Sequence, residues 1–234
     1  MKVALFDLDD TLFAHSEAVR TGITKFRRTF APNANDNTEF ARWHALEELH
    51  YHRYLAGEIG FYEQRRARAR GFAEPYGIDL TTDEFADAWF TDYLAEYRRA
   101  WQLHPDSLAC LDELDARGIR IGVITNAELA FQMTKLDALE LTPRMQHIVA
   151  SAEVGAAKPD ARIFEHAVAL FGVEPADAMY VGDRLETDAV GASAAGLTGV
   201  WLHRGGEPSA ADAARARETG VRVIHSLAAV PGLL

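Results

Sequence analysis

Short apolar runs alternate with amphipathic segments over the second half of the chain, and this alternation restricts the fold more than any other feature. Runs rich in apolar and β-branched residues predict strands. The predicted strands are residues 3–6, 119–125, 147–151, 179–182, 198–202 and 221–225. The segments between them predict helices, including residues 108–118, 158–172 and 187–196. Strands that alternate with helices need crossover connections, so we predict an α/β fold: a Rossmann-like parallel sheet with helices on both faces.

Residues 14–102 lack this alternation and contain no convincing strand. Apolar residues recur there at helical spacing instead. The three stripes are Val19, Ile23, Phe26 and Phe30; Phe40, Trp43, Leu46 and Leu49; and Phe85, Trp89, Tyr93 and Tyr97. Their aromatic residues are typical of helix packing, although they could also line a substrate pocket. We therefore predict two domains: an α/β core from residues 1–14 and 103–234, and a helical domain, residues 15–102, inserted after the first strand over the carboxyl edge of the sheet.

Composition excludes several classes of protein. The 234 residues are 48% hydrophobic and carry a formal net charge of −11, which disfavours a general nucleic-acid or anionic-membrane binder. The one cysteine, Cys110, lies in a helical pattern; it reads as a core residue and fits a reducing compartment. No apolar run is long enough for a spanning helix, and the N-terminus reaches charge too early for a secretory signal. We expect a cytoplasmic protein.

A cluster of carboxylates directly follows the first predicted strand. The stretch VALFDLDDTLF, residues 3–13, places Asp7, Asp9 and Asp10 after an apolar run. Two such charges about 4 Å apart repel by roughly 4 kcal/mol at an effective dielectric of about 20. A chain that places them at the end of a buried strand needs a partner that offsets this repulsion.

Other polar residues follow the other predicted strands, and ligands of open parallel sheets bind where the strands end. The predicted edge carries Asp7, Asp9, Thr125, Asn126, Lys158, Asp183 and Asp188. Carboxylate oxygens in this number suit a hard cation such as Mg²⁺, which would offset their repulsion. The lysine, hydroxyl and amide would hold an anion. Together these groups suit a phosphoryl group whose charge shifts during transfer.

The segments DLDDTL, TN, KP and GDRLETD, in this order, resemble the four motifs of the haloacid dehalogenase superfamily of hydrolases. The resemblance implies that Asp7 is a nucleophile that forms an aspartyl-phosphate, and that Asp9 protonates the leaving alcohol and then deprotonates water. It implies that Thr125 and Asn126 bind the phosphoryl oxygens, with Lys158 neutralising Asp7 and the transferring group.

The same resemblance implies a Mg²⁺ site and a helical cap. Asp7, Asp183 and the backbone carbonyl of Asp9 would bind the metal, while Asp188 would act near it, through water or by orienting Lys158. The inserted helices would be the cap of the superfamily. Dehalogenases and phosphonate-cleaving members lack an acid two residues after the nucleophile, so Asp9 favours hydrolysis of phosphate esters. The predicted function is a Mg²⁺-dependent phosphomonoesterase acting on a small phosphorylated metabolite, with no nucleic-acid or membrane partner.

Alternatives remain open at this point. A phosphomutase has the same fold, and a receiver-like or other non-catalytic phosphate-binding module also combines acids, a threonine and a lysine. A receiver, however, is about half this length and has no such helical insertion. There is no GxGxxG, Walker A or GxSxG motif, which removes the common dinucleotide, P-loop and serine hydrolase interpretations.

Two features of the insertion stay ambiguous. Its arginine cluster, Arg65, Arg66, Arg68 and Arg70, could read the anionic remainder of a substrate or form a solvated face with Glu63 paired to Arg66. His15 follows the first motif and could meet the substrate. The sequence names neither the substrate nor the oligomeric state.

Overall fold

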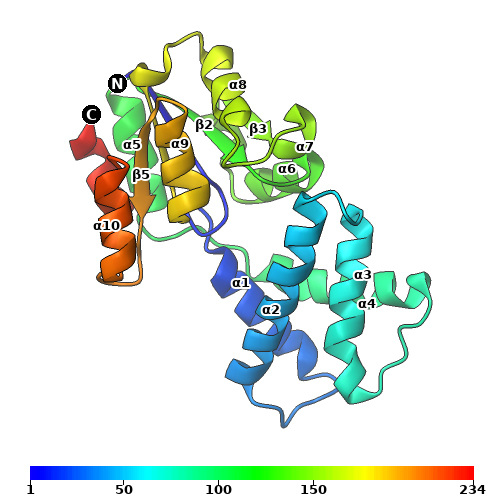
Figure 1. Ribbon diagram of the computed structural model, residues 1–234. Coiled ribbons are helices and arrows are strands. Elements are labelled where there is room, and N and C mark those ends of the chain that lie inside the picture. Colours follow the sequence, from blue (N-terminus) through cyan, green and yellow to red (C-terminus); the bar gives the residue numbers. More distant parts are fainter. The chain divides into compact units, whose positions relative to one another are not determined.

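The computed structural model describes residues 1–234 and separates into two compact units. The core unit comprises Met1–Ala14 and Gln102–Leu234, and the helical unit comprises His15–Trp101. Figure 1 labels the elements of both units, which are described separately.

All six strands of the core unit form one parallel sheet. They are β1 (Val3–Phe6), β2 (Arg120–Thr125), β3 (His147–Ala150), β4 (Ala178–Gly182), β5 (Thr198–Leu202) and β6 (Arg222–Ile224). Their order is β3-β2-β1-β4-β5-β6, so β1 lies between β2 and β4. Helices cover both faces of the sheet (Figure 1), which confirms the predicted α/β fold.

The helices of the core unit connect successive strands. They are α5 (Ser107–Ala116), α6 (Leu129–Ala138), α7 (Ser151–Val154), α8 (Ala161–Phe171), α9 (Gly191–Ala194) and α10 (Ala210–Glu218). A π-helical segment, η4 (Leu185–Val190), precedes α9, and short 3₁₀ segments occur at Thr142–Arg144, Pro175–Asp177 and Leu227–Leu233. The predicted helix over residues 187–196 is therefore π-helical in its first part.

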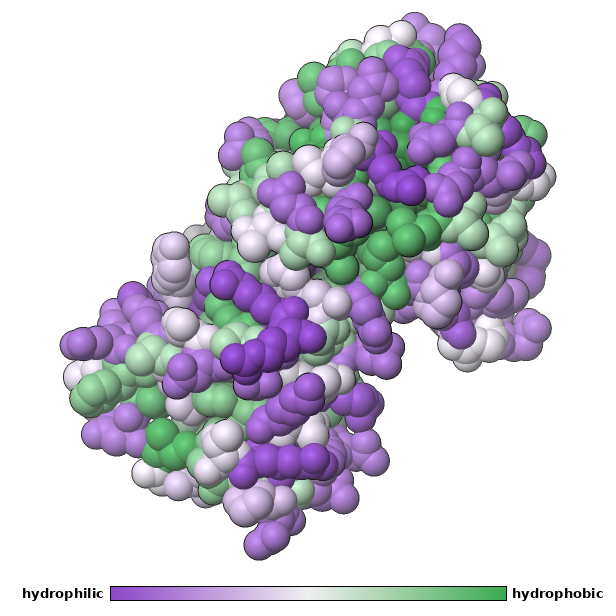
Figure 2. Space-filling model, turned by 180° about the vertical axis from the view of Figure 1, so that it is seen from behind, coloured by the Kyte–Doolittle hydropathy of each residue, from purple (hydrophilic) through white to green (hydrophobic).

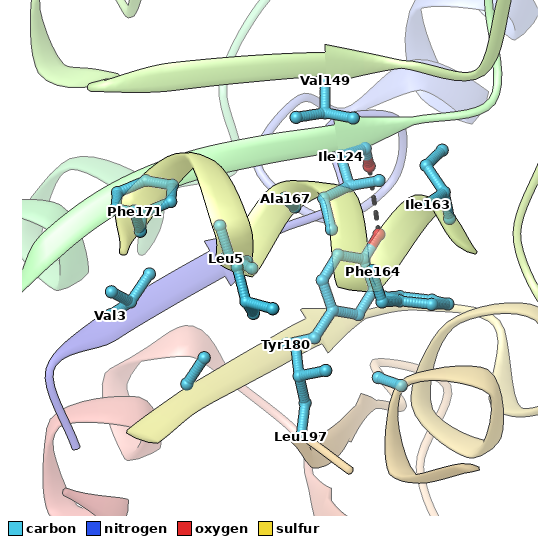
Figure 3. Close-up of a cluster of buried hydrophobic side chains, with 13 residues drawn as sticks. Val3, Leu5, Ile124, Val149, Ile163, Phe164, Ala167, Phe171, Tyr180 and Leu197 are labelled. Atoms are coloured by element: carbon cyan, nitrogen blue, oxygen red, sulfur yellow. Dashed lines mark hydrogen bonds between the residues drawn. The ribbon is translucent and has the colours of Figure 1, made fainter. Parts of the chain in front are cut away.

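Helix α8 shows why this sequence folds as it does. Asp160 caps its first turn by accepting a hydrogen bond from the Arg162 amide, and Gly172 ends it with a φ of 62°. Pro159 directly precedes the capping residue, next to the first turn of the helix. The buried face packs on the sheet: Figure 3 shows Phe164 and Phe171 beside side chains of β1, β2 and β4.

The helical unit consists of four α-helices and one 3₁₀ turn. They are α1 (His15–Arg27), α2 (Asp36–Leu55), α3 (Phe61–Ala73), η1 (Glu74–Tyr76) and α4 (Asp83–Arg99). Trp43 is fully buried at the centre, with its ring centroid 4.5 Å from Tyr93 and 5.4 Å from Phe72. The aromatic stripes therefore serve mainly as packing. Two members, Leu49 and Phe85, are 56% and 53% exposed and do not join this core.

None of the helices combines the length and the apolar character needed to cross a membrane. The face drawn in Figure 2 is dominated by hydrophilic side chains, with hydrophobic groups scattered among them. Cys110 is 2% exposed on α5 beside Leu111 and Leu114, so its prediction as a core residue is confirmed. Leu108 of the same helix is 45% exposed.

Candidate active site

The acidic cluster lies at the carboxyl edge of the sheet, at the end of its central strand. The Asp7 amide donates to the carbonyl of Val181 at 2.9 Å and so continues the pairing of β1 with β4. Thr125 ends the neighbouring strand β2, and Asp183 directly follows β4. Three segments far apart in sequence therefore meet at the switch point of the sheet, where ligands of such folds bind.

Lys158 is the centre of the buried polar network. Its Nζ donates to Asp7 Oδ1 at 2.6 Å, to Asp188 Oδ1 at 2.7 Å and to the Tyr180 hydroxyl at 2.7 Å. An ammonium group has three N–H donors, so all three are used within the protein. The Tyr180 hydroxyl in turn donates to the Ile124 carbonyl at 3.1 Å, the bond drawn in Figure 3.

Three carboxylates crowd beside this lysine. One oxygen of each of Asp7, Asp183 and Asp188 lies within 4.8 Å of the others. Burial raises the pKa of Asp7 to about 7; Lys158 opposes this, while Asp188 and Asp9 add to it. Burial, together with the charges of Asp7 and Asp188, raises the pKa of Asp183 well above its ordinary value. This negative, oxygen-rich site fits a divalent cation, because a cation would reverse both effects.

Asp188 is held in place from several sides. Besides Lys158, its carboxylate accepts a hydrogen bond at 2.9 Å from the amide of Arg184, the residue directly before the π-helical turn η4. Gly182 makes room for it, because a Cβ at that position would lie 2.4 Å from Asp188 Cγ. The ordinary burial penalty for Lys158 is overcome by Asp188 and Asp7, which raise the pKa of the lysine and keep it charged.

Asp9 is held by a different set of donors. Its Oδ1 accepts from Lys135 Nζ at 2.6 Å and its Oδ2 from Gln132 Nε2 at 3.0 Å. Gln132 Nε2 also donates to Thr125 Oγ1 at 2.7 Å. Asp7 and Asp9 of the first motif thus contact two different lysines.

Asn126 joins the second and third motifs. Its side-chain amide donates to the Lys158 carbonyl at 2.9 Å, and its Oδ1 accepts from the Lys158 backbone amide at 2.7 Å. The Lys158–Pro159 peptide bond is cis. The Asn126 side chain therefore fixes the backbone that carries the catalytic lysine candidate, in addition to any contact that it makes with a ligand.

Comparison with known proteins agrees with this geometry. Residues 1–196 match the family model of haloacid dehalogenase-like hydrolases. The chain belongs to this family. It is 32% identical over 232 residues to a phosphoserine phosphatase of Thermus thermophilus, covering 89% of this chain and 91% of that protein. It is 31% identical over 209 residues to a glyceraldehyde 3-phosphate phosphatase of Methanopyrus kandleri, covering 88% of this chain and 85% of that protein.

The fold of this hydrolase is shared with solved structures. The crystal structure of the HAD-hydrolase YfnB from Bacillus subtilis matches it with a TM-score of 0.80 at 19% identity, covering 100% of this chain and 98% of that chain. The resemblance inferred from the four motifs is thereby confirmed at the level of family and fold.

The arginine cluster of the helical unit divides into two pairs. Arg66 pairs with Asp83 and Asp87 of α4, and Arg70 pairs with Asp83. The expected pairing of Arg66 with Glu63 is replaced by these contacts, and Glu63 instead reaches back to the Gly60 amide at the start of α3.

The other two arginines face the interior of the helical unit. Arg68 pairs with Glu47 at 2.7 Å and is 6% exposed, and Arg65 lies over the Phe61 ring. Burial raises the pKa of Glu47, but Arg68 and His15 outweigh burial and lower it to about 2. His15 also pairs with the Tyr97 hydroxyl at 2.9 Å, so its ring is engaged within the same unit.

Three residues of the core network are not predicted by the sequence patterns: Gln132, Lys135 and Tyr180. Lys135 and Gln132 are 2% and 0% exposed, and they lie three residues apart on one face of α6. The sequence feature that could have indicated Gln132 and Lys135 is a pair of polar residues in the predicted helical segment after the TN motif. Tyr180 lies inside an apolar strand, where its hydroxyl gives no pattern of its own.

Proposed function

We propose that this hydrolase is a Mg²⁺-dependent phosphomonoesterase that cleaves a small phosphorylated metabolite through an aspartyl-phosphate intermediate. One observation carries the proposal. Asp7 lies in a buried cluster with Lys158 and two further carboxylates, whereas Asp9, two residues away, is held separately by Lys135. Two carboxylates in different environments suit two different roles, one as nucleophile and one as acid–base group.

In the first half of the reaction, an Asp7 carboxylate oxygen attacks phosphorus and the bond to the leaving oxygen breaks. Asp9 gives its proton to that oxygen, which leaves as an alcohol. Thr125 donates its hydroxyl to a phosphoryl oxygen, since Gln132 already occupies an acceptor position on Thr125 Oγ1. Lys158 offsets the negative charge chiefly through its field, because its three N–H groups are bound by protein oxygens.

In the second half, Asp9 takes a proton from water as the water oxygen attacks the aspartyl-phosphate. The bond between Asp7 and phosphorus breaks, which releases phosphate and restores both carboxylates to their starting states. An acid–base group of this kind assists an alkoxide leaving group and gives no benefit to a departing halide. The presence of Asp9 therefore supports ester hydrolysis over dehalogenation.

Asp7, Asp183 and the backbone carbonyl of Asp9 are the proposed Mg²⁺ ligands. Mg²⁺ at this site would offset the carboxylate repulsion and stabilise charge on the phosphoryl oxygens. Asp188 already accepts hydrogen bonds from Lys158 and from the Arg184 amide, so we assign it an orienting role beside the metal.

The relatives support a small phosphate monoester as substrate. The two phosphatases named above act, by their names, on phosphoserine and glyceraldehyde 3-phosphate. Both compounds are three-carbon phosphate monoesters, so a screen should begin with compounds of this size. We propose that His15–Trp101 is the cap of this hydrolase and carries the residues that distinguish among them.

The first experiment measures hydrolysis of 4-nitrophenyl phosphate with Mg²⁺ and with EDTA, for the wild type, Asp7→Asn and Asp177→Asn. Asp177 is an exposed aspartate paired with Lys2, so its substitution controls for the loss of a carboxylate elsewhere. Activity that needs Mg²⁺ and Asp7 but not Asp177 supports the proposal. Activity retained in Asp7→Asn would refute the mechanism. Product analysis on sugar phosphates distinguishes a phosphatase, which releases phosphate, from a phosphomutase, which moves it.

A further inference from the structure

We propose that Gln132 and Lys135 of α6 are positioning residues for phosphate-ester cleavage: together they fix the Asp9 carboxylate and the Thr125 hydroxyl. This inference rests on the proposed function and deepens it. Neither residue belongs to the four motifs, and both act on residues more than one hundred positions away or in another element.

Lys135 is a buried cation that forms an ion pair with Asp9. Its side chain is 3% exposed, and its Nζ lies 5.2 Å from the centroids of the Phe13 and Phe131 rings. Moving an ammonium group into such surroundings is unfavourable unless a close partner compensates for the lost water. The short contact to Asp9 Oδ1, at 2.6 Å, supplies that compensation and restricts where the carboxylate can lie.

Gln132 connects Asp9 to Thr125. When Asp9 is ionised, between its two proton transfers, its carboxylate only accepts hydrogen bonds, so the NH₂ end of the Gln132 amide faces it and also donates to Thr125 Oγ1. A hydroxyl that accepts from Gln132 must point its own proton elsewhere. The contact therefore leaves the Thr125 hydroxyl as a donor, the role that a phosphoryl oxygen requires.

A stabilising role alone explains this arrangement poorly. A buried ion pair contributes little net stability, because desolvation of both charges offsets their attraction. The Asp9 side chain is also 31% exposed, so Lys135 is buried while the Asp9 carboxylate remains accessible to solvent. A carboxylate held rigidly yet accessible suits a group that must meet a leaving oxygen within about 2.6–3.2 Å.

The affected steps are the two proton transfers of Asp9. Its proton goes to the leaving oxygen as the Asp7–phosphorus bond forms, and a proton returns from water as that bond breaks. Substrates differ in how much they need the first transfer. An alkyl phosphate expels a strongly basic alkoxide and requires the proton, whereas 4-nitrophenyl phosphate expels a weakly basic phenolate that leaves without it.

The experiment compares kcat/KM of full-length Lys135→Met with that of the wild type on glycerol 3-phosphate and on 4-nitrophenyl phosphate, with Mg²⁺. General acid catalysis contributes about 10²–10⁴-fold, so we expect a fall of about 10²-fold on the alkyl ester and under about tenfold on the aryl ester. Lys2→Met is the matched control. It removes the exposed pair of Lys2 with Asp177 and should leave both rates unchanged.

Two further variants make the test independent of folding losses. Gln132→Met keeps the Lys135–Asp9 pair, and we expect the same preference for the aryl ester together with severalfold weaker inhibition by orthovanadate, which occupies the phosphoryl site that Thr125 serves. Lys135→Met in an Asp9→Asn background should cost less than about threefold on the alkyl ester beyond Asp9→Asn alone, since a positioning residue acts through its partner.

These measurements distinguish a positioning role of Gln132 and Lys135 from a purely structural one. Equal losses of kcat/KM on both esters, or additive losses in the double variant, would overturn the positioning role. The proposed function would still be supported if the wild-type activity depends on Mg²⁺ and Asp7. Absence of that activity in the wild type on every ester tested would overturn the proposed function, and this inference with it.

Discussion

Replacing Asp7 with asparagine is expected to abolish turnover and, in EDTA, to stabilise the core unit at pH 8. The structure gives the reason. Asp7 is 7% exposed beside Asp183 and Asp188, and Lys158 is shared between Asp7 and Asp188. Asparagine removes one buried negative charge and keeps an oxygen that can accept the hydrogen bond from Lys158.

The expected gain follows from the pKa of Asp7, which burial chiefly raises from 3.8 to about 7. A carboxyl group whose pKa is raised by folding stabilises the protein below its unfolded-state pKa, and this contribution is lost as the pH rises through the folded-state pKa. Each unit of pKa difference corresponds to about 1.4 kcal/mol, so the ionised Asp7 costs up to roughly 4 kcal/mol above pH 7. The Asp7→Asn variant avoids that cost at every pH.

The assay is urea unfolding in EDTA at several pH values between 5 and 8, followed by tryptophan fluorescence. Trp201 reports on the core unit, because its Nε1 donates to the Asp183 carbonyl at 2.8 Å. The other three tryptophans belong to the helical unit, so the two transitions are fitted separately. We expect Asp7→Asn to be more stable by roughly 2–4 kcal/mol at pH 8 and by less than half as much at pH 5.

Asp177→Asn is the matched control. It removes an exposed aspartate whose pKa is lowered by its hydrogen bond with Lys2, so no gain is expected at any pH. A loss of stability in Asp7→Asn at pH 8 would refute the reasoning, since it means that Lys158 outweighs burial and the neighbouring carboxylates. A gain that does not change with pH would refute it too, since the gain would then not come from the ionisation of Asp7. Excess Mg²⁺ should stabilise the wild type more than the variant.

Three further outcomes follow from the structure. Gly182→Ala brings a Cβ to within 2.4 Å of Asp188 Cγ, so kcat/KM should fall by about 10²-fold, measured on any ester that the wild type cleaves. Glu47→Gln should destabilise the helical unit at pH 7. The difference in stability between the wild type and this variant should disappear as the pH falls from 4.5 to about 2, because Arg68 lowers the pKa of Glu47. Acid unfolding curves of both proteins measure this difference. Cys110, whose pKa burial raises to about 12, should react with a thiol reagent only after urea unfolds the protein, and rapid reaction of the native protein would contradict its burial.

The positions of the motif residues could be predicted because each follows a recognisable strand. Asp7, Thr125 and Asp183 come directly after or at the end of apolar runs, and parallel strands bring such ends to one edge. Lys158 precedes a helix with a clear cap and a glycine stop. Local periodicity and one topological rule were enough to assemble these segments.

The contacts of α6 could not be predicted in the same way. Lys135 and Gln132 are polar residues of a helix with little amphipathic contrast, and such residues usually face water. Both contact Asp9 in the loop after β1, which lies 126 and 123 residues away in the chain from Lys135 and Gln132. Sequence spacing contains no information on contacts between residues so far apart in the chain.

The errors in the helical stripes have a simple geometric cause. Residues that recur every three positions drift by about 60° per step around a helix of 3.6 residues per turn. Leu49 is two such steps from the buried Trp43 and has rotated out of the core. Phe85 lies in the first turn of α4, at the end of a stripe whose four-residue spacing drifts in the opposite direction.

The first motif also shows why spacing alone does not assign chemistry. Asp7 and Asp9 are two residues apart and identical in sequence terms, yet the fold gives each its own lysine from a different segment, Lys158 before α8 and Lys135 within α6. Asp7 is crowded by other carboxylates, a state that a cation would relieve and that leaves it able to attack phosphorus. Asp9 lies outside that crowded group and keeps 31% of its side chain exposed. The donors around each carboxylate, together with its place in the motif, therefore distinguish the two proposed roles.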